Sequence, residues 1–204
     1  MINSWRILTV FCTALAALFV LAGCTTPPPA NFNEQVAAAI YRMGEKDQEV
    51  RREALADPDD ATQRGTLRRV DRENTEQLRA IIKQYGWPGR SLVGQRGANT
   101  AWLIVQHADH DRAFQKECLK LMTAAPEGEV APEDIAFLTD RVLLAEGKKQ
   151  RYGTQFKKVG GRFVPQPLED EVNVDVRRKK LGLPPLAEYA RQLGEVYGTP
   201  PPTK

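Results

Sequence analysis

From Asn99 to Thr123 the chain reads NTAWLIVQHADHDRAFQKECLKLMT. At about 100° per residue, its apolar side chains fall within one arc of roughly 160°, the pattern of an amphipathic helix. His107, Asp111 and Gln115 fall inside the same arc at intervals of four. We therefore expect an imidazole, a carboxylate and an amide along one core-facing ridge of a single helix.

The rest of the chain predicts further helices and one hairpin. The predicted helices cover 32–55, Leu67–Tyr85, Pro132–Glu146, Val172–Gly182 and Pro185–Tyr197. Asp57-Pro58-Asp59-Asp60 predicts a break between the first two and a cap for the second, whose Arg68, Arg69, Asp71, Arg72 and Glu73 are expected in solvent. The Gly160-Gly161 pair predicts a tight turn in a β-hairpin at about 152–164. The predicted fold class is mainly α, a single helical domain over 32–197 with one small β-hairpin in the C-terminal half.

The beginning of the chain predicts export and lipid attachment. Arg6 precedes an apolar run, Ile7–Leu21, which is shorter than the roughly 20 residues that a membrane-spanning helix needs. The run ends in Leu21-Ala22-Gly23-Cys24, which resembles the lipobox of bacterial lipoproteins. The alternative is an ordinary signal peptide that is cut near Ala22.

This resemblance predicts where the protein is found. Residues 1–23 are expected to be a signal peptide, 24–31 a lipidated Cys24 with a Pro-rich tether, and 198–204 a disordered tail. Acyl chains on Cys24 would hold the protein on a membrane at the cell envelope. If the cell is Gram-negative, Thr25 and Thr26 favour the periplasmic face of the outer membrane.

Composition excludes some functions. The net charge is +3, with basic and acidic residues interspersed, so no strong field indicates a nucleic-acid partner. With Cys12 in the leader and Cys24 lipidated, only Cys118 remains, and it cannot form an internal disulfide. We expect no cofactor. We also expect no metal, because His107 and His110 are the only histidines and no HExxH motif is present.

Several short sequence motifs, here called words, follow one another along the chain. They are Gly86-Trp87-Pro88, Ala101-Trp102-Leu103, Gln106-His107-Ala108-Asp109, Asp140-Arg141, Tyr152-Gly153-Thr154-Gln155 and Val174-Asp175-Val176-Arg177-Arg178. As an ordered set over about Leu67–Tyr189, they resemble a family of uncharacterised bacterial proteins, a domain of unknown function marked by the words QHAD and YGTQ. This resemblance implies a mainly helical domain with a small hairpin, and it implies no known activity.

The same words supply a candidate site. Asp111, one helical turn from His107, would orient the imidazole as a general base. Arginines would bind a carboxylate or phosphate, and uncharged side chains at the start of the hairpin would add hydrogen bonds. The candidate binding residues are Gln115, Asp140, Arg141, Tyr152, Thr154, Gln155, Asp175 and Arg178. They predict a polar pocket between helix and hairpin for an anionic small ligand, a peptide or an envelope protein.

Two interpretations of this cluster remain open. The polar residues could instead satisfy one another in an internal network that contacts no ligand. Within the functional interpretation, binding is favoured over catalysis, because the sequence has no GxSxG elbow and Cys118 lies on the apolar arc. We therefore expect a ligand-binding or scaffold module, with a small hydrolase-like enzyme using His107 as its base as the alternative.

Overall fold

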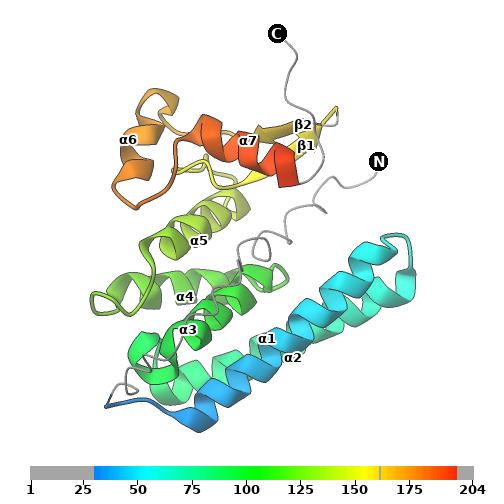
Figure 1. Cartoon of the computed structure of the whole chain (residues 1–204), viewed down its shortest axis with the longest axis vertical. Coiled ribbons are helices and arrows are strands. Elements are labelled where there is room, and N and C mark those ends of the chain that lie inside the picture. The colour runs from blue at the N-terminus through cyan, green and yellow to red at the C-terminus, as the bar shows by residue number, and fades with distance from the viewer. Residues whose placement is uncertain (1–29, 161, 197–204) are drawn as a thin grey trace, which may run out of the picture. The chain divides into compact units, whose positions relative to one another are not determined.

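The computed structural model describes residues 30–160 and 162–196 (Figure 1). The predicted signal peptide, Cys24 and the C-terminal tail lie outside these residues. The described chain divides into two compact units, residues 30–130 and residues 131–196, which we call the N-terminal and C-terminal units and describe separately. The expectation of a single domain stays a prediction.

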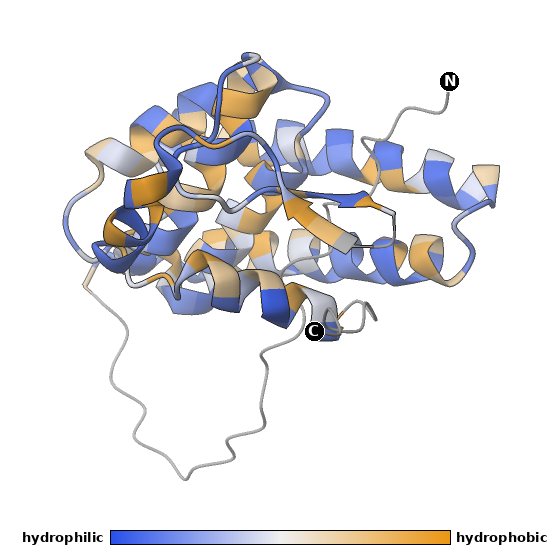
Figure 2. Cartoon of the chain, turned by 90° about the horizontal axis from the view of Figure 1, so that it is seen from above, coloured by the Kyte–Doolittle hydropathy of each residue, from blue (hydrophilic) through white to orange (hydrophobic). Residues whose placement is uncertain are grey.

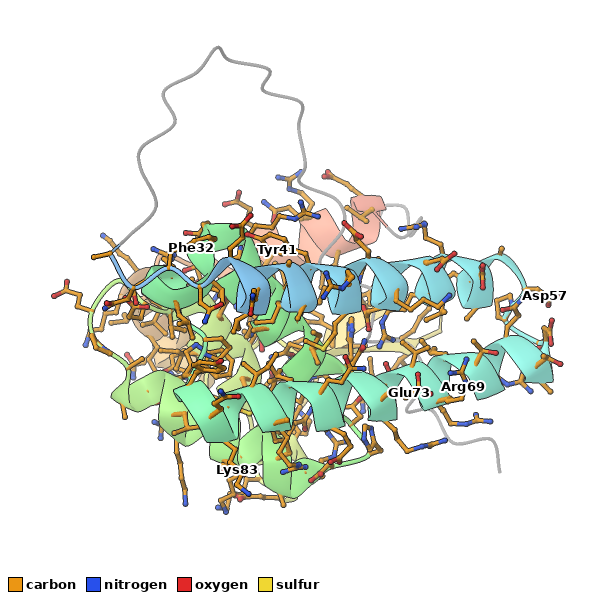
Figure 3. All side chains as sticks on the ribbon, turned by 90° about the horizontal axis from the view of Figure 1, so that it is seen from below. Phe32, Tyr41, Asp57, Arg69, Glu73 and Lys83 are labelled. Atoms are coloured by element: carbon orange, nitrogen blue, oxygen red, sulfur yellow. The ribbon has the colours of Figure 1, made fainter. Side chains whose placement is uncertain are left out.

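The N-terminal unit contains α1 (Glu34–Ala56), α2 (Ala61–Tyr85), α3 (Arg90–His107) and α4 (Arg112–Ala124). Helices α1 and α2 lie side by side, and Figure 3 shows Asp57 at the turn that joins them. As predicted, Asp60 caps α2, because its Oδ1 accepts a hydrogen bond from the Thr62 N–H at 2.7 Å. Figure 2 shows hydrophobic and hydrophilic residues interspersed along the helices. The buried apolar residues of this unit include Ile40, Leu78 and Ile104.

The prediction of one continuous helix over Asn99–Thr123 is wrong. Helix α3 begins earlier, at Arg90, bends at Gly94 and ends at His107, and α4 begins at Arg112. The break has a local cause, because the Asp111 carboxylate accepts a hydrogen bond from the Phe114 N–H at 2.9 Å and so caps α4. His107, Asp111 and Gln115 therefore do not form a ridge along one helix.

The C-terminal unit contains α5 (Pro132–Ala145), β1 (Phe156–Val159), β2 (Arg162–Pro165), η1 (Glu171–Asn173), α6 (Val174–Lys179) and α7 (Leu186–Val196). The strands are antiparallel, with Phe156 opposite Pro165 and Val159 opposite Arg162. Gly160 has a φ of 55° in the turn, a conformation that glycine adopts easily. Phe156 is buried, and its ring forms a T-shaped contact with the ring of Tyr189 on α7, with 5.6 Å between the ring centroids.

The predicted fold class is confirmed: the protein is mainly helical, with a small antiparallel hairpin in its C-terminal half. The C-terminal helices differ in extent from the prediction, since α6 covers only Val174–Lys179 and follows a 3-10 turn. Among the helices of residues 30–160 and 162–196, none is long and apolar enough to cross a membrane.

Candidate functional site

His107 lies at the end of α3 and is 4% exposed. Its Nδ1 is 2.9 Å from Oδ1 of Asp47 and 2.9 Å from Nε of Arg51, both on α1. In one tautomer Nδ1 accepts the Arg51 N–H, and in the other it donates to the Asp47 carboxylate. The sequence predicted an orienting carboxylate for this histidine. The structure provides Asp47 in that place, whereas Asp111 caps α4.

Arg51 connects His107 to two carboxylates. Its guanidinium is 3.1 Å from Asp47 Oδ1 and also forms an ion pair with Asp71 on α2. We call Asp47, Arg51, Asp71 and His107 the polar cluster; α1, α2 and α3 all contribute to it. Asp71 has the most exposed side chain of the three charged members, at 15%.

The two carboxyl groups of the polar cluster have different pKa values. Burial opposes ionisation of Asp47, but the hydrogen bond to His107 and the charges of His107 and Arg51 outweigh it and lower the pKa to about 2. Burial raises the pKa of Asp71 to about 7 in spite of Arg51, and the Asp47 and Asp109 carboxylates add to the rise. At neutral pH, Asp47 is therefore ionised, whereas Asp71 is partly protonated.

The polar cluster also has the atoms of a metal site. Ligand atoms of Asp47, Asp71 and His107 lie within 4.8 Å of one another. The Arg51 guanidinium already contacts all three side chains, so a metal ion would have to displace it. The expectation of no metal stays a prediction.

The other predicted residues of the N-terminal unit connect helices. Besides capping α4, Asp111 accepts a hydrogen bond from Arg79 on α2 at 2.5 Å. Gln115 is fully buried, and its amide donates to the carbonyl of Val105 at 3.0 Å. Both side chains therefore fix α4 against neighbouring helices.

In the C-terminal unit, Asp140 organises the segment before β1. Its carboxylate accepts hydrogen bonds from the backbone N–H groups of Arg151 at 2.7 Å, Tyr152 at 3.0 Å and Thr154 at 2.9 Å. The Thr154 hydroxyl donates a further bond at 2.9 Å. Burial raises the pKa of Asp140, and the N–H groups oppose this effect. The Asp140 carboxylate thus binds backbone N–H groups of its own unit.

Arg178 is 1% exposed and has a similar role. It donates to the backbone carbonyls of Tyr152 at 2.7 Å and Pro184 at 2.6 Å, and its guanidinium lies over the Tyr189 ring. The structure therefore joins Arg178 to the same segment as Asp140.

The remaining candidates of this unit lie around that network. Gln155 is buried and donates to the Thr154 hydroxyl at 3.1 Å, whereas Asp175 accepts from the Leu186 N–H at 2.7 Å and Arg141 is half-buried on α5. The predicted pocket would join these residues to His107 in the other unit, and it stays a prediction.

A surface hollow of about 290 Å³ lies between α1 and α3. We call it the α1–α3 hollow; its lining consists of Tyr41, Gly44, Glu45, Gln48, Arg52, Arg96, Thr100 and Leu103. Figure 3 shows Tyr41 on α1. Gln48 connects the hollow to the polar cluster, because its side-chain amide donates to Asp47 Oδ2 at 2.8 Å.

Sequence reasoning missed three members of the polar cluster. Asp71 was expected in solvent but is partly buried. Asp47 continues the apolar stripe of α1, since it follows Ile40 and Met43 at helical spacing and is 1% exposed. A carboxylate at a core position of this stripe, with Arg51 one turn later, is the signal that could have found the cluster.

Comparisons with known proteins give one finding. A model of the family of unknown function DUF6624 matches residues 34–200. The match thus includes α1, which lies outside the span of the words that suggested the resemblance. No curated protein and no solved structure matches the chain.

Proposed function

Because the chain belongs to DUF6624, a family of unknown function, its role has to be argued from its sites, and we propose a ligand-binding module held at the cell envelope by lipid on Cys24. The observation that carries the binding role is the α1–α3 hollow and its hydrogen bond, through Gln48, to the polar cluster. A buried network behind a surface hollow fixes the position of a recognition side chain.

The lining of the hollow favours a small anionic ligand. Arg96 stacks on Tyr41 at 4.6 Å and pairs with Glu45 at 3.1 Å, but this pair is about two-thirds exposed and therefore weak. A carboxylate or phosphate on the ligand can replace Glu45 as the partner of Arg96. Because the volume is at the lower end for ligand sites, the ligand is the size of an amino-acid derivative or a peptide side chain.

N-Acetylglutamate is a suitable first probe. In a nuclear magnetic resonance titration, we expect shift changes at the Gln48 side-chain amide and at Thr100, with affinity reduced about tenfold in Arg96→Met, a loss typical of a charged hydrogen bond. Arg69→Met is the matched control, because Arg69 forms an exposed pair with Glu73 on α2, away from the hollow. Equal affinities in the parent and Arg96→Met would refute binding at this hollow.

The envelope location rests on the lipobox-like sequence Leu21-Ala22-Gly23-Cys24. Cells supplied with an alkyne-labelled fatty acid should yield labelled protein in the membrane fraction. Cys24→Ala should remove the label. Labelling that persists in Cys24→Ala would place the lipid elsewhere and reject this part of the proposal.

The polar cluster favours a second candidate, a small hydrolase-like enzyme that uses acid–base chemistry. Its support is the buried contact of 2.9 Å between His107 Nδ1 and Asp47 Oδ1, together with the separation of the two carboxyl pKa values, about 2 for Asp47 and about 7 for Asp71, which makes Asp47 a permanently ionised group and Asp71 a proton donor. His107 would be the general base and Asp47 its orienting partner. Turnover of ester, amide or phosphoester probes should then disappear in His107→Gln. Turnover that is unchanged in this variant would exclude the enzyme.

A further inference from the structure

The segment around the hairpin carries charge of one sign. Residues 147–168 contain no Asp or Glu, and their basic residues are Lys148, Lys149, Arg151, Lys157, Lys158 and Arg162. Two of them have acidic partners outside the segment: Lys148 pairs with Glu146, and Arg151 with Glu169. The strands β1 and β2 lie within this basic segment.

One face of the hairpin is apolar, basic and exposed. Lys157 is opposite Val164 in the ladder, and Val159 follows two residues later on the same face. Val159 is 53% and Val164 38% exposed. The opposite face carries Phe156, which packs against Tyr189 of α7. Helix α7 therefore covers one face and leaves Lys157, Val159 and Val164 in solvent; we call these three residues the hairpin patch. Lys158 lies on the other face, opposite Phe163 in the ladder.

We infer that the hairpin patch contacts a membrane surface of anionic phospholipid. Exposed aliphatic side chains enter the headgroup region, and the lysine ammonium groups bind lipid phosphates. Lys157 forms no ion pair with a described residue, so its charge is available to the lipid. The Lys158 ammonium lies 5.9 Å from the centroid of the Phe163 ring on the other face, and its exposed side chain adds to the positive charge of the hairpin.

This inference rests on the proposed lipid anchor in one respect, which is distance. The ten residues from Cys24 to Asn33 can span at most about 33 Å when fully extended. A lipid on Cys24 would thus keep the domain beside the bilayer at high effective concentration, where a weak surface contact is sufficient. The patch alone determines which lipid is preferred.

The test uses the full processed chain on vesicles of phosphatidylcholine, with or without phosphatidylglycerol. Flotation with the vesicles measures the tether, and hydrogen exchange followed by mass spectrometry measures the hairpin. We expect the backbone amides of β1 and β2 to exchange more slowly when phosphatidylglycerol is present, and this protection to disappear at high salt. Peptides from α2 should exchange equally on both vesicles.

Lys157→Glu with Lys158→Glu should abolish the added protection without changing flotation. The charge-matched control is Arg68→Glu with Arg69→Glu on α2, which should keep the protection. Equal exchange on both vesicle types, or protection that survives the two hairpin substitutions, would overturn the inference. Failure to float with phosphatidylcholine alone would reject the tether, while phosphatidylglycerol-dependent flotation would still support the patch.

Discussion

At the residue scale, Arg51→Met tests what holds the polar cluster together. The substitution keeps an apolar stem but removes the charge between Asp47 and Asp71. We expect the free energy of unfolding to fall by about 3–5 kcal/mol, because both buried carboxyl groups lose the guanidinium that pairs with them. Urea unfolding measures this change. Arg69→Met is the control and should lose less than about 1 kcal/mol, since its pair with Glu73 is exposed; equal losses in the two variants would contradict this account.

Asp71 should make the free energy of unfolding depend on pH. Its pKa is about 7 in the folded protein, against a usual value of 3.8, so the folded state binds the proton more tightly. The resulting stabilisation is fully present below about pH 4 and is lost as pH rises to about 7. We expect it to amount to a few kcal/mol at most.

Urea unfolding of the parent and of Asp71→Asn at several pH values tests this effect. The stability of the parent relative to the variant should decrease between pH 4 and pH 7. Parallel curves over this range would show that Asp71 has an ordinary pKa. Asp47 cannot produce the same trend, because its lowered pKa gives stability that is lost only on acidification towards pH 2.

At the element scale, the close approach of α1 and α3 depends on Gly44. A Cβ at this position would lie 2.4 Å from the Cγ2 of Thr100. The Thr100 rotamer is held by a hydrogen bond from its hydroxyl to the Arg96 carbonyl at 2.8 Å, so the methyl group cannot turn away freely. Gly44→Ala should therefore lower stability by on the order of 1–3 kcal/mol, although alanine favours helix.

Thr100→Ser provides the matched rescue for Gly44→Ala. Serine keeps the hydroxyl and removes the methyl group that a Cβ would meet. Thermal or urea unfolding should show the double variant to be close to the parent. A double variant no more stable than Gly44→Ala would mean that another contact limits the helix spacing.

The sequence predicted that the segments on both sides of residues 108–111 are helical, but it did not predict the break after His107. Apolar periodicity continues across residues 108–111, and it does not distinguish one helix from two that share a buried side. What decides is a local bond, the Asp111 carboxylate on the Phe114 N–H. Capping aspartates inside a periodic segment are therefore as informative as glycine or proline.

At the scale of the whole molecule, the fold class followed from periodicity, but the candidate site did not. His107 was predicted because it lies within an apolar arc. Its partners come from α1 and α2, and their pairing depends on how three helices pack, which spacing within one helix cannot show. The hairpin was predictable because the Gly160-Gly161 pair is a strong local signal.

The thiol content of the processed protein is a prediction for the whole chain. Burial raises the pKa of Cys118, so its thiol should be unreactive in the folded protein. If Cys12 is removed with the leader and Cys24 carries lipid, titration with a thiol reagent should find no reactive group in the native state and a single one after unfolding. A reactive thiol in the native protein would contradict lipidation of Cys24.

The polar cluster has a consequence for how the N-terminal unit assembles. Arg51 meets Asp71 and His107 only when α1, α2 and α3 are aligned at one height. Sliding α1 by one turn, about 5.4 Å, would leave its apolar stripe largely in contact but would separate the guanidinium from its partners. The ion pairs thus favour one register of α1 against α2 and α3, because any other register leaves the buried charges without partners.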